Sequence, residues 1–138
     1  MKKKILLIFI ISCITISCNN QEDFIQDVYV SEFIDLSLPQ YSEISITGNA
    51  VFIEGGVEGI IIFKDVGDNF KIFDRNCSYE PSSTCAKIDS ISSGIAICGC
   101  CSSAFLISSS GEAINAPAIL PLKKYSWSLS NNILHIYN

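Results

Sequence analysis

The 138-residue sequence is poor in histidine and in basic residues. It contains one histidine, His135, and nine lysines and arginines against fourteen aspartates and glutamates. Binding to a nucleic-acid backbone requires clustered basic residues, and beyond the N-terminus the only adjacent pair is Lys123 and Lys124, so we expect no nucleic-acid partner. A Ser/His/Asp catalytic set would have to use His135, which alternates with Leu134 and Ile136 as an ordinary strand residue does. We therefore expect a non-enzymatic protein.

The sequence also lacks a long apolar run outside its first residues. Lys2–Lys4 followed by the mostly apolar Ile5–Ile16 has the charge and length of a signal peptide, and is too short for a transmembrane helix, which needs about 20 residues. The run ends with the letters TISC at Cys18, before polar residues. This arrangement resembles a bacterial lipobox, whose cysteine becomes the lipidated first residue. We expect a lipoprotein signal peptide at residues 1–17, lipidation of Cys18 and a tether at residues 18–27.

Two alternatives stay open at this end of the chain. The letters IISC at Cys13 fit the lipobox pattern slightly better but leave a shorter apolar region, and an ordinary secretory signal would leave both cysteines without lipid. The acidic residues after Cys18 resemble the surface-export signal of Bacteroidetes-type lipoproteins. The expected location is the bacterial cell envelope, with the domain anchored in the membrane by two or more acyl chains.

From residue 28 onward the sequence consists of short strand-like runs separated by turn residues. No segment of the mature chain has the sustained 3.6-residue period of an amphipathic α-helix. The last two runs alternate around Ser130-Asn131-Asn132, which predicts a terminal hairpin. The length allows one domain, so we expect residues 28–138 to form one all-β domain. The expected strands cover 28–30, 33–34, 44–47, 51–53, 59–63, 70–73, 94–97, 104–107, 125–129 and 133–137.

Five cysteines fall in two expected loops, each of which follows a strand. Cys77 and Cys85 lie in the first loop, and Cys98, Cys100 and Cys101 lie in the second. Thiolates are the usual ligands of iron–sulfur clusters and also bind zinc, whereas an oxidising compartment favours disulfides. These two loops are the candidate functional site.

The two cysteine loops resemble those of the Rieske iron–sulfur family, and the resemblance covers roughly residues 24–138. That family carries a Cys-x-His loop and, further along, a loop that typically reads Cys-Pro-Cys-His-Gly-Ser-x-Phe. Cys77 falls on the first ligand cysteine and Cys98 on the second. The resemblance implies an antiparallel β-sandwich with both cysteine loops at one tip. The expected trailing positions are occupied by Phe105, Gly111, Pro117-Ala118 and Pro121-Leu122.

Both histidine ligands of the Rieske centre are replaced. Tyr79 stands at the first histidine position and Cys101 at the second. Two histidine ligands raise the potential of a Rieske cluster above that of all-cysteine clusters. One interpretation is therefore an altered [2Fe-2S] cluster of low potential, held by Cys77, Cys98 and Cys101 with Tyr79 or Cys85 as fourth ligand.

Two further interpretations remain open for the same tip. In the first, the thiolates hold a structural metal such as Zn²⁺. In the second, the tip binds no metal. Rieske domains of the cytochrome bc complexes carry a disulfide between their cluster loops, and by this resemblance Cys85 and Cys100 fall near its positions. Cys77 and Cys98 would then oxidise together and leave Cys101 unpaired.

The leader favours the interpretation without a cluster. Exported Rieske proteins commonly use the twin-arginine route, which carries folded and cofactor-loaded protein, and this leader has no Arg-Arg pair. We therefore expect a disulfide-linked envelope lipoprotein with a binding or structural role towards an envelope protein. A low-potential electron carrier is the alternative.

Overall fold

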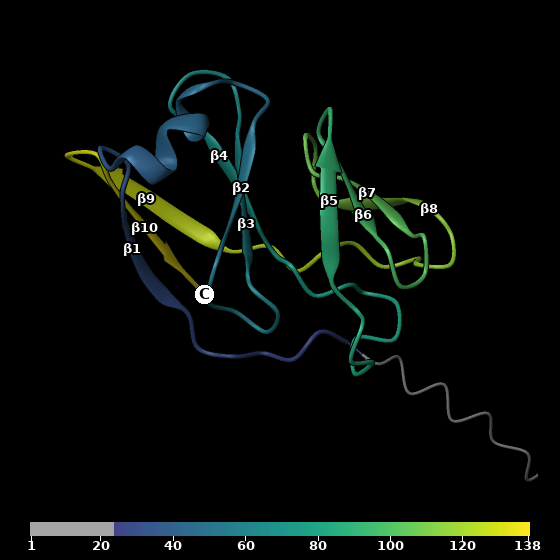
Figure 1. Cartoon of the computed structure of the whole chain (residues 1–138). Helices are drawn as coiled ribbons and strands as arrows, with labels where there is room; N and C mark the ends of the chain where they lie inside the picture. Colours follow the sequence, from purple (N-terminus) through teal and green to yellow (C-terminus); the bar gives the residue numbers. More distant parts are fainter. Residues whose placement is uncertain (1–23) are drawn as a thin grey trace, which may run out of the picture.

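The computed structural model describes residues 24–138 (Figure 1). The expected signal peptide, the two candidate lipidation sites Cys13 and Cys18, and most of the expected tether lie outside the described residues. Within residues 24–138, no helix has the length and apolarity that crossing a membrane requires. The elements are β1 (Ser31–Asp35), η2 (Pro39–Ser45), β2 (Ala50–Ile53), β3 (Ile60–Lys64), β4 (Phe70–Asp74), β5 (Ile88–Ser92), β6 (Ile95–Cys98), β7 (Ala104–Leu106), β8 (Glu112–Asn115), β9 (Ser126–Ser130) and β10 (Ile133–Tyr137).

The strands form three antiparallel sheets. The terminal sheet has the order β1-β10-β9, the middle sheet β2-β3-β4 and the four-stranded sheet β5-β6-β7-β8. Adjacent strands in all three sheets run antiparallel. The all-β, antiparallel fold that the sequence predicts is thereby confirmed.

In the middle sheet, β3 and β4 are buried on both faces because they lie between two cores. Side chains alternate along a strand, so Ile60 and Ile62 of β3 face the core shared with the terminal sheet. Ile61 and Phe63 face the core shared with the cysteine loops and the four-stranded sheet. This double burial explains why β3 is a continuous apolar run rather than an alternating one.

The terminal and middle sheets are joined at one edge and separate at the other. The backbone N–H of Asp74 donates to the Lys123 carbonyl at 2.8 Å, and the N–H of Tyr125 donates to the Ile72 carbonyl at 2.9 Å. These bonds connect β4 to the segment that leads into β9. At the opposite edge, β1 and β2 each have one strand partner only, and Figure 1 shows η2 above this side of the molecule.

One expected strand is wrong. Residues 44–47 were expected to alternate on a sheet, but Ile44 ends up buried in η2 and Ile46 is 60% exposed beyond it. Pro39 lies in the first turn of η2, where its missing N–H and fixed φ favour a helical start. The short period-2 pattern therefore belongs to a 3₁₀-helix and its exit.

Other boundaries differ in smaller ways. Residues 28–30 are irregular, and β5 and β8 are additional strands that the sequence did not predict. Both additional strands are largely polar and exposed, so they lack an apolar run. The predicted terminal hairpin is confirmed: β9 pairs with β10 around Asn131 and Asn132, which both adopt positive φ.

Candidate metal centre

The two cysteine loops leave the ends of β4 and β6 and meet at one end of the core. The first loop is held where the N–H of Cys77 donates to the Ala86 carbonyl at 2.9 Å. The second is held where the N–H of Cys98 donates to the Ser103 carbonyl, also at 2.9 Å. Phe105, Ala118 and Leu122 pack into the same core. The loops are thus fixed by backbone bonds on a packed base.

Three cysteines converge between the loops. The sulfurs of Cys77, Cys98 and Cys101 all lie within 4.8 Å of one another, and the Cys77 and Cys101 sulfurs are 3.6 Å apart. Cys77 and Cys98 are fully buried, whereas Cys101 is partly exposed. The structure therefore brings together the three cysteines that the sequence singled out, and this triad can bind a metal.

The spacing within the triad matches the ligand shell of one metal ion. At a metal–sulfur distance of about 2.3 Å, tetrahedral geometry separates two ligand sulfurs by about 3.8 Å. The Cys77 and Cys101 sulfurs, 3.6 Å apart, are close to this value, and the other separations lie below 4.8 Å. A [2Fe-2S] cluster needs four protein ligands spread over two irons. In residues 24–138 no fourth histidine, cysteine or carboxylate lies within 4.8 Å of all three sulfurs, so the triad by itself supplies three of the four ligands that the cluster needs.

Two of the three thiols, Cys77 and Cys101, have pKa values shifted in opposite directions. Burial, with the neighbouring Cys98 and Cys101 sulfurs adding to it, raises the pKa of Cys77. Burial also raises the pKa of Cys101, but hydrogen bonds with Ser103 and with the other two sulfurs outweigh it, so the net pKa is lowered. Metal ligation requires thiolates. Cys101 is therefore better prepared than Cys77 to become a thiolate.

Ser103 supports the Cys101 thiolate from a fully buried position. Its Oγ accepts the N–H of Ala118 at 2.9 Å and lies 3.1 Å from the Cys101 sulfur. The Cys101 S–H donates to this oxygen; because a hydroxyl both accepts and donates, Ser103 can turn its own proton to the sulfur once the thiol ionises. Ser103 was not recognised from the sequence, since a serine in a Ser-rich loop carries no signal of such a contact.

Tyr79 lies half-buried against the same core as the triad. Hydrogen bonding to the Glu80 carboxylate, together with its negative charge, raises the pKa of Tyr79. The phenolate is the form that binds metal, and Glu80 disfavours it. Tyr79 is therefore poorly prepared to be the fourth ligand.

A disulfide links the two loops beside the triad. Cys85 and Cys100 are bonded, with their Cα atoms 5.5 Å apart, a separation within the normal range. Cys85 therefore does not offer a free thiolate as fourth ligand. Cys77 and Cys98 are both free, so the structure contains no disulfide between these two cysteines.

Removing this disulfide is expected to destabilise the domain. The bond closes a loop with a sequence separation of 15 residues, and a loop of that length corresponds to about 3 kcal/mol of stabilisation. We expect Cys85→Ala combined with Cys100→Ala to lower the free energy of unfolding by about that amount in urea titrations. A loss below about 1 kcal/mol would show that the loops hold together without the bond.

A buried carboxylate fixes the start of the first loop. Asp74, fully buried at the end of β4, accepts the Tyr125 hydroxyl at 2.5 Å. It also accepts the backbone N–H groups of Val57 and Asn76, both at 2.7 Å, and of Glu58 at 3.4 Å. Burial and the bond to Asp74 raise the pKa of Tyr125, so its hydroxyl remains a donor. One carboxylate thus ties the β2–β3 turn, the first loop and the segment before β9 together.

Comparison with solved structures shows which known folds this architecture resembles. A chain of the complex of reduced oxygenase and oxidized ferredoxin in carbazole 1,9a-dioxygenase matches with a TM-score of 0.51 and 13% identity, covering 81% of this chain and 94% of that one. The fold is that of a Rieske-type ferredoxin. The ferredoxin of carbazole 1,9a-dioxygenase from Nocardioides aromaticivorans IC177 also matches, with a TM-score of 0.48 and 14% identity over 66% of this chain and 86% of that one.

The likeness to Rieske-type ferredoxins is one of fold. No protein-family model matches the chain. No curated protein sequence matches it at a significant level. At this low identity, the identity of a bound group has to be argued from the residues of the site itself.

Proposed function

We propose that this chain is a non-enzymatic, lipid-anchored protein of the bacterial cell envelope whose Rieske-type fold holds a single metal ion. Cys77, Cys98 and Cys101 are its ligands in this proposal. The observation that carries it is the mutual distance of the three sulfurs, all within 4.8 Å, because a spacing this small suits ligands of one metal ion.

The chemistry of the three sulfur ligands restricts which metal ions can bind. Three thiolates are soft ligands, which favour Zn²⁺, Cu⁺ or iron over Mg²⁺ or Ca²⁺. Two of the sulfurs are buried and the third is partly exposed, so a fourth ligand has access from the Cys101 side. The ion would cross-link the two loops beside the disulfide and give the tip one fixed shape.

A fixed tip suits the binding role that we propose. Ser78 Oγ donates to the Leu120 carbonyl at 2.6 Å, which holds the segment after β8 against the first loop. The neighbouring Ile119 is 84% exposed. An apolar side chain held out beside a rigid loop supports contact with an envelope protein.

The test is the metal and sulfide content of the native protein. We would measure iron, zinc, copper and acid-labile sulfide per chain, with a visible spectrum, on mature protein isolated anaerobically from its own membranes. We expect one metal ion and no sulfide. Two irons and two sulfides would overturn the single-metal proposal in favour of an altered [2Fe-2S] electron carrier. A metal-free protein would overturn both.

The same preparation tests the anchor. The mass of the N-terminal peptide is expected to show acyl chains on Cys18, with residues 1–17 removed. An unmodified N-terminus or a soluble protein would contradict the proposed envelope attachment, whatever the metal content.

A further inference from the structure

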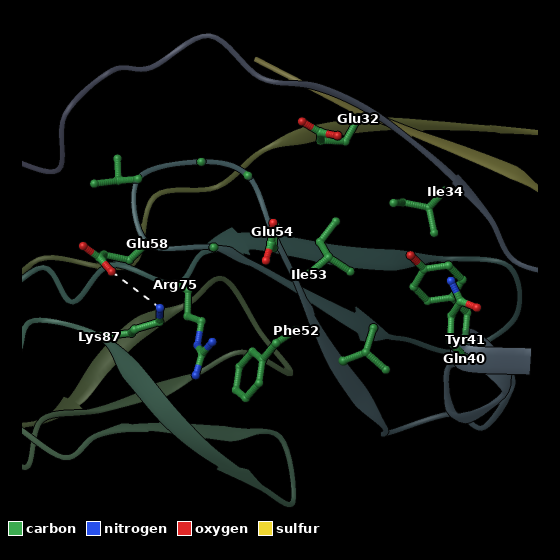
Figure 2. Close-up of a pocket in the computed structure, with 15 residues that line it drawn as sticks. Glu32, Ile34, Gln40, Tyr41, Phe52, Ile53, Glu54, Glu58, Arg75 and Lys87 are labelled. Atoms are coloured by element: carbon green, nitrogen blue, oxygen red, sulfur yellow. Dashed lines mark ion pairs between the residues drawn. The ribbon is translucent and has the colours of Figure 1, made fainter.

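A groove runs along the free edge of β2, on the side of the molecule away from the β4–β9 junction. It has a volume of about 870 Å³ and is bounded by β1 and η2 on one side and by the β2–β3 turn, Arg75 and Lys87 on the other. Figure 2 shows these side chains around the open space. β2 pairs with β3 alone. Its outer backbone N–H and C=O groups therefore have no strand partner among residues 24–138.

The wall towards the terminal sheet is apolar apart from Glu32 of β1 and Gln40 of η2. Ile34 of β1 and Tyr41 of η2 face Val51 and Ile53 of β2 across it. The last three are only partly buried. An unpaired strand edge beside apolar side chains is the arrangement that accepts an added strand, whose backbone pairs with the edge while alternate side chains enter the wall.

The cations of the groove are already engaged. Lys87 Nζ lies 3.5 Å from Glu58 Oε2. Arg75 donates from Nε to the Ile88 carbonyl at 2.6 Å, and its guanidinium lies 3.9 Å from the centre of the Phe52 ring. The charge of Lys87 is thus paired with Glu58, and the guanidinium of Arg75 is held against Phe52 by its bond to the Ile88 carbonyl.

The acidic side chains, in contrast, include two without a cation. Glu32 on β1 and Glu54 after β2 both line the groove, and no ion pair is formed by either within the described residues. The remaining charge of the groove is therefore negative. It complements a basic ligand and disfavours a second copy of this acidic chain.

We propose that the free edge of β2 binds an extended, basic segment of a partner protein by strand addition. Backbone hydrogen bonds to β2 hold the segment, apolar side chains at alternate positions enter the wall formed by Ile34, Tyr41 and Ile53, and a lysine or arginine pairs with Glu32 and Glu54. The proposal is independent of the metal centre, which lies in the other core of the molecule.

The experiment uses a defined probe. A fluorescein-labelled peptide of alternating valine and lysine, with threonine at its ends, is titrated with the full mature protein and followed by fluorescence anisotropy. We expect saturable binding, with amide NMR shifts concentrated in β2 and the facing residues of β1. Methylation of alternate backbone nitrogens of the peptide removes the strand bonds and is expected to abolish binding. So is replacement of its lysines by glutamates.

Charge reversal provides the matched control. Glu32→Lys and Glu54→Lys are each expected to weaken binding about tenfold, whereas Glu43→Lys, an exposed position on η2 outside the groove, leaves it unchanged. Absence of binding would overturn the proposal. Equal binding of the glutamate or N-methylated peptide, an equal loss with Glu43→Lys, or dimerisation through β2 in sedimentation experiments would overturn it as well.

Discussion

Replacing Cys98 by serine is expected to abolish the metal binding that we propose for the triad, while leaving the β fold in place. Cys98 is fully buried and supplies one of the three clustered sulfurs, so its loss leaves two, and among residues 24–138 no other histidine, cysteine or carboxylate belongs to the group. We expect affinity to fall by at least about 100-fold, since even a change outside the ligand shell costs 10- to 100-fold. Competition with a chromophoric chelator measures the change.

Two control variants separate ligation from general loop damage. The double replacement of Cys85 and Cys100 by alanine removes two cysteines outside the triad and is expected to retain one metal per chain. Ser103→Ala removes the hydroxyl 3.1 Å from the Cys101 sulfur and is expected to weaken binding by about tenfold. Undiminished metal content in Cys98→Ser would contradict the three-thiolate site.

Replacing Asp74 by alanine is expected to cause the largest loss of stability. The change leaves the Tyr125 hydroxyl and the N–H groups of Val57 and Asn76 without their acceptor inside the protein. Each unpaired buried donor costs about 1–3 kcal/mol, with incomplete additivity, so we expect the free energy of unfolding to fall by about 4 kcal/mol. Urea denaturation followed by circular dichroism measures this.

Two comparisons make the Asp74 result specific. Tyr125→Phe removes one of the donors together with its bond and is expected to cost about 1–2 kcal/mol. Asp68→Ala, at a side chain that is 94% exposed, is expected to stay within about 0.5 kcal/mol. If Asp74→Ala were as mild as Asp68→Ala, the carboxylate would not be holding the three segments together.

The strands that sequence predicts are those whose side chains meet a core. β3 and β4 are apolar because they lie between two cores, and β9 and β10 alternate because one face is exposed. β5 and β8 are held mainly by backbone pairing with polar side chains outward, so their sequences carry little signal. The strand predicted at residues 44–47 was wrong because a short alternation of apolar and polar residues fits a strand and the exit of a 3₁₀-helix equally well.

In the candidate site, too, some residues could be predicted from the sequence and others could not. The cysteines could be found because thiol chemistry restricts what they do, and their spacing carried the likeness to Rieske loops. The partners of the site could not be found. Ser103 and Asp74 act through contacts with Ala118 and Tyr125, which are distant in sequence, and such contacts exist only once the chain has folded.

The burial of β3 on both faces has a consequence for how the molecule opens. Its residues contribute to both cores at once, so neither half can melt while the other keeps its packing intact. The two cysteine loops and the groove along β2 then belong to one cooperative unit. Amide exchange in β3 should therefore proceed only through global unfolding. A ligand that stabilises either end would slow exchange throughout the protein, even though the two sites share no side chain.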